Sequence, residues 1–161
     1  MVTTIKNLLA PELIEKIKTR VFSQDFPWYW RNNMVNNDHF WFNHSFYREG
    51  KSQSPHYKEW ILPIINKLDY KILICARCNM TIKENKPYTS DLHTDYKLPN
   101  LKTAIFYLNT CNGGTVLMID GKEKFIETEE NKIIIFPGKT LHRAVSQTDV
   151  NRRIVFNINY V

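Results

Sequence analysis

The second half of the chain consists of short segments with strong β-propensity, and this pattern limits the possible folds more than any other feature of the sequence. After residue 70, β-branched and aromatic residues recur in runs separated by the turn-forming pairs Gly113-Gly114, Asp120-Gly121 and Pro137-Gly138. The predicted strands cover residues 71–82, 102–109, 115–119, 123–128, 132–137, 141–146 and 152–160. Many short strands joined by such turns are typical of a β-sandwich or a jelly roll.

Two amphipathic helices are predicted before these strands. The first, over residues 8–22, has an apolar residue at every fourth position, and Pro11 suits its first turn. The second begins at Ser54-Pro55, with the serine as N-cap, and Pro63 is expected to kink it. Each helix must cover apolar surface, so we expect both to pack outside one sheet of a single domain that spans residues 1–161.

The region between the helices is predicted to contain two further strands. Residues 26–31 read as a short edge strand, and residues 39–47 as a strand in which His44 is interpreted as a buried core residue rather than a ligand. We expect a turn-rich loop over residues 32–38 and a mobile polar loop over residues 48–54.

Three of the predicted strands pair an apolar face with a polar one. The apolar faces carry Ile72, Ile74, Ala76, Cys78, Met80 and Ile82; Ala104, Phe106 and Leu108; and Ile154, Phe156, Ile158 and Tyr160. The polar faces carry Arg77, Asn79 and Thr81; Thr103, Tyr107 and Asn109; and Arg153, Val155, Asn157 and Asn159. Either the polar faces meet water, or they line the mouth of a barrel whose apolar faces lie under the helices. Periodicity alone does not decide between these arrangements.

A histidine and an aspartate directly after the first of these strands favour the second arrangement. His93 and Asp95 can both point into one cavity if Thr94 points away, and His142, which follows the turn Pro137-Gly138, is the candidate third ligand. Two imidazoles and one carboxylate on one face of an octahedron leave positions open for substrates, as in non-haem Fe(II) oxygenases. A His-x-Asp pair by itself is more often part of a surface loop, so this interpretation depends on the other motifs.

The overall charge and the cysteines add weaker constraints. Lysine and arginine outnumber aspartate and glutamate by 22 to 16, a net charge of +6. Such an excess can favour acidic partners or nucleic acid, but basic residues scattered along the chain are more typical of a solvated surface. Cys75, Cys78 and Cys111 are too few for a disulfide framework. Cys75 and Cys78 would face opposite sides of one strand, so we interpret them as buried thiols.

No apolar run is long enough to cross a membrane, and residues 1–10 lack the layout of a signal peptide. We therefore expect a soluble protein in the cytoplasm that has no contact with a membrane.

Several motifs occur in a set order along residues 26–160. They are FPWYW at 26–30, Arg77 with Asn79, HTD at 93–95, IFYLN at 105–109, GGTVLMI at 113–119, FPGKTLH at 136–142 and RIVFNINY at 153–160. In this order and spacing the chain resembles the Fe(II)- and 2-oxoglutarate-dependent dioxygenases, in particular the small phage and bacterial members of the prolyl-4-hydroxylase-like branch. The resemblance implies a mainly β fold with flanking helices, a double-stranded β-helix (a cupin-like jelly roll) with the N-terminal helices packed on one sheet.

The resemblance also implies roles for individual residues. His93, Asp95 and His142 would bind Fe(II). The family uses an arginine on the last strand to hold the distal carboxylate of 2-oxoglutarate, because a guanidinium meets a carboxylate with two parallel hydrogen bonds. Strand parity favours Arg153 over Arg152, since Arg153 shares the polar face of that strand.

Other positions have less certain equivalents in the family. Tyr107 stands where relatives place a tyrosine hydroxyl on the same carboxylate, although a tyrosine buried in the core is the alternative. Arg77 and Asn79 face the same cavity by parity and are candidates for contact with cosubstrate or substrate. Val155 replaces a serine that many relatives carry two residues after the arginine.

The function implied by the resemblance is that of a dioxygenase that uses Fe(II), 2-oxoglutarate and O2, with ascorbate as a supporting reductant. Such an enzyme converts 2-oxoglutarate to succinate and CO2 while it hydroxylates a prime substrate, here a protein side chain, a nucleobase or a small metabolite. The alternatives are a non-catalytic cupin-like protein that binds a metal or ligand, and a nucleic-acid-binding module. The complete set of His93, Asp95, His142 and Arg153 favours the oxygenase.

Overall fold

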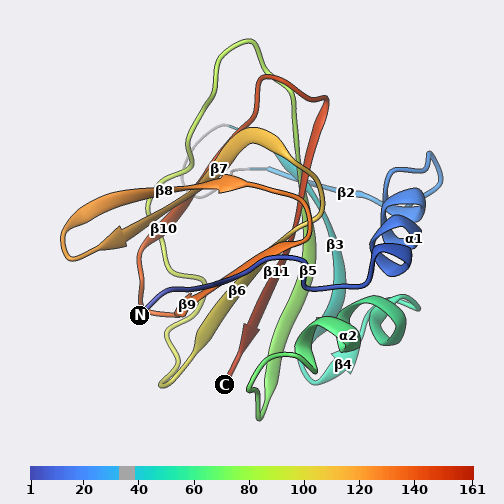
Figure 1. Ribbon diagram of the computed structural model, residues 1–161, viewed down its shortest axis with the longest axis horizontal. Coiled ribbons are helices and arrows are strands. Elements are labelled where there is room, and N and C mark those ends of the chain that lie inside the picture. Colours follow the sequence, from blue (N-terminus) through green and yellow to red (C-terminus); the bar gives the residue numbers. More distant parts are fainter. Residues whose placement is uncertain (33–38) are drawn as a thin grey trace.

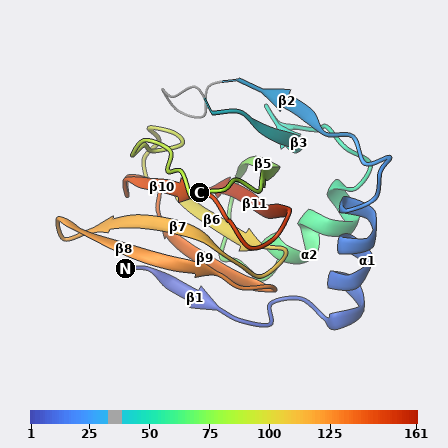
Figure 2. The same cartoon turned by 90° about the horizontal axis from the view of Figure 1, so that it is seen from above.

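The structure is a computed structural model that describes residues 1–32 and 39–161, and its strands form two antiparallel sheets (Figure 1). The larger sheet has the strand order β1-β9-β6-β11-β5-β3-β2, with β4 paired to β3 beside this path, and the smaller sheet has the order β10-β7-β8. Strands β1 and β2 lie at opposite ends of the larger sheet (Figure 2).

The strands of the larger sheet are β1 (Thr3–Ile5), β2 (Tyr29–Arg31), β3 (Trp41–Arg48), β4 (Lys51–Ser52), β5 (Leu73–Ile82), β6 (Lys102–Tyr107), β9 (Lys132–Pro137) and β11 (Arg152–Tyr160). Those of the smaller sheet are β7 (Cys111–Ile119), β8 (Lys122–Thr128) and β10 (His142–Val145). The predicted mainly β jelly roll with flanking helices is confirmed. The expected loop at 32–38 lies, apart from Asn32, outside the described residues.

Both helical segments cover the same face of the larger sheet, as expected (Figure 1). They are α1 (Pro11–Val21) and a π-helical turn at Tyr57–Ile61 that continues into α2 (Leu62–Ile65). Pro63 lies at the start of α2, where the π-helical turn changes to α-helix, because proline has no N–H to continue the preceding hydrogen-bond pattern. The main core between helices and sheet contains Ile17, Val21, Trp60, Ile61, Ile64, Cys78, Phe106 and Phe156.

A smaller core lies between the two sheets. It contains Ile105, Tyr107, Leu117, Ile134, Phe136 and Val155. The residues of β6, β9 and β11 in this cluster come from the larger sheet, and Leu117 comes from the smaller one. The larger sheet is therefore covered on both faces, by helices on one side and by the smaller sheet on the other.

One predicted face changes side because of a β-bulge. Asn159 pairs with Cys75, but the next residue, Tyr160, pairs with Leu73, so Ile74 is skipped. A skipped residue reverses which side chains face the core. Leu73 is therefore buried, and Ile72, which the alternation placed in the apolar row, is 59% exposed.

Two further local expectations were wrong, and one strand was missed. Gly113 and Gly114 lie inside β7 rather than in a turn. The expected mobile loop at 48–54 contains a tight hairpin, in which Glu49 and Gly50 have φ of 53° and 75° and link β3 to β4. Strand β1 was not predicted at all. Cys75 and Cys78 are buried and free, as predicted, and Cys111 is buried and free as well.

Candidate metal centre

His93 and His142 are brought together by the main chain. They form an antiparallel bridge in which His93 N donates to His142 O (3.0 Å) and His142 N donates to His93 O (2.9 Å). Side chains of directly opposed residues project from the same face, so the two imidazoles lie side by side with ring centroids 4.5 Å apart. The backbone therefore sets the spacing of these two candidate ligands.

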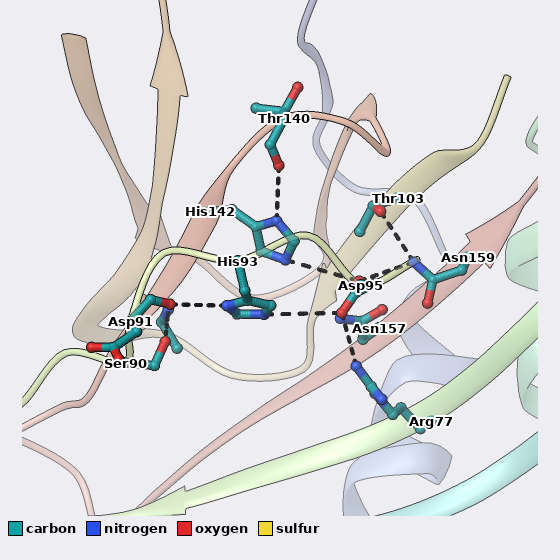
Figure 3. Close-up of polar contacts among 11 residues, drawn as sticks. Arg77, Ser90, Asp91, His93, Asp95, Thr103, Thr140, His142, Asn157 and Asn159 are labelled. Carbon is teal, nitrogen blue, oxygen red and sulfur yellow. Dashed lines mark hydrogen bonds and ion pairs between the residues drawn. The ribbon is translucent and has the colours of Figure 1, made fainter. Parts of the chain in front are cut away.

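The other nitrogen of each imidazole is held by a backbone carbonyl. Nδ1 of His93 lies 2.9 Å from Asp91 O, and Nδ1 of His142 lies 3.1 Å from Thr140 O. A carbonyl only accepts, so each Nδ1 carries the hydrogen and each Nε2 presents a lone pair. Both Nε2 atoms face the carboxylate of Asp95 (Figure 3).

Asp95 completes a three-ligand cluster. His93 Nε2 lies 4.0 Å from Asp95 Oδ1, and His142 Nε2 lies 3.9 Å from Asp95 Oδ2. One ligand atom from each of the three residues lies within 4.8 Å of the others. Two neutral imidazoles and one carboxylate on one side of a small volume are a donor set that suits a divalent transition metal such as Fe(II).

The carboxylate of Asp95 is held in its charged form although its side chain is only 2% exposed. Burial alone would raise the pKa of Asp95, but the Arg77 guanidinium, with smaller contributions from His142 and Asn159, keeps this pKa below its usual value. For His142, burial lowers the pKa, and this keeps the imidazole neutral and available as a ligand. Both shifts favour the protonation states that a metal requires.

The cluster opens into a cavity of about 350 Å³ between the two sheets. The polar faces predicted for β5 and β11 line it through Arg77, Asn79, Thr81, Arg153, Val155 and Asn157. The arrangement with polar residues inside a barrel mouth is therefore confirmed. Thr94, which we expected to point away, also contributes to the cavity wall.

Arg153 lies in this cavity as a buried cation without an anion. It is 3% exposed and donates to Thr128 Oγ1 (2.9 Å), Gly114 O (3.1 Å) and Thr115 Oγ1 (3.4 Å), all of which are neutral. No carboxylate of residues 1–32 or 39–161 forms an ion pair with it. Burial lowers the pKa of its guanidinium. A buried, unpaired charge is costly, so the environment of Arg153 suits an anionic ligand.

The neighbouring arginine points the other way. Arg152 donates from Nη2 to Phe22 O (3.2 Å), and its guanidinium carbon lies 4.7 Å from the centre of the Phe22 ring, beside the end of α1. The parity argument that placed Arg153 in the cavity and Arg152 outside it therefore agrees with the structure.

The remaining predicted residues lie close to Arg153 or in the cavity wall. Tyr107 is fully buried; its hydroxyl donates to Thr115 Oγ1 (3.0 Å), and the guanidinium carbon of Arg153 lies 5.8 Å from its ring centre. Tyr107 is not itself part of the cavity wall, whereas Asn79 is. The aromatic residues at 28–30 are absent from the described wall: Trp28 packs on the main core, and Tyr29 and Trp30 are about half exposed.

Sequence reasoning missed Thr115 and Gly113 as parts of this site. The Thr115 hydroxyl accepts hydrogen bonds from both Tyr107 and Arg153, and Thr115, like Val155, contributes to the cavity wall. A Cβ on Gly113 would lie 2.8 Å from Val145 O and 3.1 Å from Arg153 Cδ, so only glycine allows β7 to approach this closely. Both belong to the GGTVLMI motif, for which the sequence alone predicts no role.

Neither a protein-family model nor a curated protein matches the sequence. Solved structures do match the fold. An oxidoreductase of the 2OG-Fe(II) oxygenase family from Burkholderia pseudomallei aligns with 99% of this chain and 84% of its own, at a TM-score of 0.73 and 11% identity. A Trichoplax adhaerens prolyl hydroxylase, solved with a hypoxia-inducible-factor peptide fragment, aligns over 99% and 83% at 0.71 and 12%.

A non-haem alpha-ketoglutarate-dependent carbocyclase from nogalamycin biosynthesis also matches, over 99% of this chain and 78% of its own, at a TM-score of 0.72 and 9% identity. The chain thus has the fold of the 2-oxoglutarate–Fe(II) oxygenases, the fold that the sequence motifs implied. In the described residues, no helix is both long and apolar enough to cross a membrane.

Proposed function

We propose that this protein is an Fe(II)- and 2-oxoglutarate-dependent dioxygenase that couples conversion of 2-oxoglutarate to succinate with hydroxylation of a second substrate. The observation that supports this most is the buried, unpaired Arg153 in the same cavity as the His93, Asp95 and His142 cluster. A metal site and a cationic subsite within one cavity suit a ligand with one chelating end and one carboxylate end, as 2-oxoglutarate has.

The roles of the residues follow from this arrangement. His93, Asp95 and His142 would hold the metal, and bound Fe(II) with 2-oxoglutarate and O2 supplies the oxidising chemistry. Arg153 would pair with the distal carboxylate, with Thr115 as a hydroxyl donor, because the Thr115 oxygen accepts from Tyr107 and Arg153 and its hydrogen remains to be donated. Tyr107 would act through Thr115, because its own hydroxyl lies behind that side chain. The protein supplies the cavity and the orientation of these groups within it.

For the second substrate we propose a protein side chain. The cavity wall includes the half-buried Trp41 of β3, with the Arg77 guanidinium carbon 5.9 Å from its ring centre, and Ala144 of β10. An aromatic and a small residue in the wall suit a compact, partly apolar group such as a proline or an aliphatic side chain. A peptide lies in the solved Trichoplax hydroxylase of the same fold.

The proposal is tested by an anaerobic titration of the Fe(II)-loaded protein with 2-oxoglutarate, in which chelation is followed by visible charge-transfer absorption. Arg153→Ala is compared with Arg152→Ala, which removes the same charge from the opposite face of the same strand. We expect absorption in the native protein and in Arg152→Ala, and a much weaker affinity in Arg153→Ala. A folded, iron-loaded native protein without this absorption would instead support the non-catalytic metal- or ligand-binding alternative.

The choice of second substrate is tested separately by succinate release. Peptides with varied central residues, single-stranded oligonucleotides and small metabolites are each added to the Fe(II)- and 2-oxoglutarate-loaded protein. Stimulation by peptides alone supports the proposal. If only an oligonucleotide or only a metabolite stimulates succinate release, that class of compound is the substrate instead of a protein side chain. The proposed reaction class would still stand.

A further inference from the structure

Three side chains from two adjacent strands surround the carboxylate of Asp95 (Figure 3). Arg77 of β5 and Asn157 of β11 are directly opposite each other in the sheet, and Asn159 lies two residues further along β11 on the same face. All three donate to Asp95, which comes from the segment after β5. The sheet register therefore places three donors around one carboxylate.

The bonds are unevenly divided between the two carboxylate oxygens. Asp95 Oδ2 accepts from Asn157 Nδ2 (3.2 Å) and Asn159 Nδ2 (2.9 Å), whereas Oδ1 accepts from Arg77 Nη2 (3.0 Å). A carboxylate has about four lone-pair sites in all, two on each oxygen. Both sites of Oδ2, which lies 3.9 Å from His142 Nε2, are thus taken, and one site remains on Oδ1, which lies 4.0 Å from His93 Nε2.

The orientations of the two amides are fixed by the same contacts. A carboxylate can only accept, so the NH2 groups of Asn157 and Asn159 must face Asp95. Asn159 Nδ2 also donates to Thr103 Oγ1 (3.0 Å). The amide oxygens of both asparagines are buried without a hydrogen-bond partner among the described residues. A buried amide oxygen without a hydrogen bond costs free energy. The charge-assisted hydrogen bonds to Asp95 offset this cost and hold the two side chains in place.

We propose that Arg77, Asn157 and Asn159 are positioning residues that hold Asp95 ready before the metal arrives and leave only Oδ1 free to bind it. This inference rests on the proposed function in that a divalent metal occupies the cluster. It adds a role to the sequence-based expectation that Arg77 contacts cosubstrate or substrate, because Arg77 Nη2 donates to Asp95.

The division of the bonds has a chemical purpose. An aspartate that binds through one oxygen takes one position on the metal, whereas an aspartate that binds through both takes two. With Asn157 and Asn159 on Oδ2, the second oxygen is withheld, and the positions needed by 2-oxoglutarate and O2 stay available. Loss of either asparagine frees Oδ2, so the variant is expected to bind the metal more weakly and in a different geometry.

The test uses Co(II) alone as the probe, without 2-oxoglutarate, so its readouts do not depend on turnover. Affinity is measured by calorimetry, and the visible absorption of bound Co(II) reports its coordination. Asn157→Ala and Asn159→Ala are expected to bind Co(II) about 10- to 100-fold more weakly, as is typical when a partner of a metal ligand is removed. Their Co(II) spectra are expected to differ from the native spectrum.

Four further variants complete the test. Asn43→Ala removes a buried asparagine from β3 of the same sheet that accepts a bond from Arg31, and we expect native affinity and spectrum. Arg77→Lys, which keeps the charge, is expected to retain more affinity than Arg77→Gln. Asp95→Ala should abolish binding. Thermal unfolding without metal shows which variants are folded. If an asparagine variant is not folded, Arg77→Gln takes its place in the comparison of Co(II) affinity.

The outcomes separate the positioning role of the three donors from the existence of the metal site. Native affinity and an unchanged spectrum in folded Asn157→Ala and Asn159→Ala would overturn the positioning role while leaving the metal site in place. A native protein that binds no Co(II), or an Asp95→Ala variant that binds as tightly as the native protein, would overturn both the positioning role and the proposed function.

Discussion

Replacing Arg153 by methionine should separate the cost of its buried charge from its role in binding. Methionine keeps an unbranched stem beside Gly113 but removes the guanidinium. Without ligand, the variant loses three hydrogen bonds from a charged donor to neutral acceptors, one of them long at 3.4 Å, at about 1.5–3 kcal/mol each. The variant is also relieved of the cost of burying a cation that is only 3% exposed, and this cost is several kcal/mol. The two contributions oppose each other, so we expect ligand-free stability within about 2 kcal/mol of native.

The same substitution should remove stabilisation by 2-oxoglutarate. A ligand at 100 times its Kd stabilises the native state by about 2.7 kcal/mol. For a domain of this size, 1 kcal/mol corresponds to about 2–4 °C in Tm, so the native protein should gain roughly 5–11 °C. Losing one partner of a buried charge pair costs about 3–5 kcal/mol, enough to abolish this gain in Arg153→Met.

The assay is thermal unfolding of the Co(II)-loaded protein with and without 2-oxoglutarate, beside unfolding of the metal-free protein. A variant that is strongly destabilised without ligand but still gains the native increment in Tm would refute the reasoning. That result would mean that Arg153 acts as a structural residue and that the carboxylate of 2-oxoglutarate lies elsewhere.

Three further predictions follow from the site and the core. Asp95→Ala should abolish succinate release, and unchanged release would refute the metal assignment. Gly113→Ala should lower stability by about 1–3 kcal/mol through overpacking against Val145 O, and weaken 2-oxoglutarate binding more than Co(II) binding; an unchanged Tm would contradict the close approach. Burial lowers the pKa of His44 below its usual value of 6.5, because burial disfavours the charged imidazole. The stability that neutral His44 contributes to the folded protein is therefore present above pH 6.5 and is lost as pH falls toward the folded-state pKa. Chemical denaturation across this pH range should show a smaller loss of unfolding free energy in His44→Gln than in the native protein.

Strand alternation was the sequence signal that predicted most of the site. It separated Arg153 from Arg152 and placed Asn79, Asn157 and Asn159 on the cavity face, because side chains of period two must fall on opposite sides of a strand. Where the sheet is irregular the same rule failed. The bulge opposite Ile74 cannot be read from the sequence, since the extra residue is defined by the register of β5 against β11.

Long-range register also explains why other features were missed. Asp95 and its donors come from three places in the chain, and the pairing of Asn157 with Arg77 brings the donors together. Gly113 and Gly114 were interpreted as a turn because glycine usually marks one. Here their lack of a Cβ allows close contact with Val145, Arg153 and Phe125, which is a tertiary property.

The segment that carries His93 and Asp95 is joined to β10 at three successive points. Tyr88 exchanges bonds with Ser146, Ser90 with Ala144, and His93 with His142. The ligands are thus fixed from Tyr88 onward, independently of the chain that leads from the end of β5 to that point. Changes in the length or sequence of residues 84–87 are accordingly expected to leave the bridge between His93 and His142 in place.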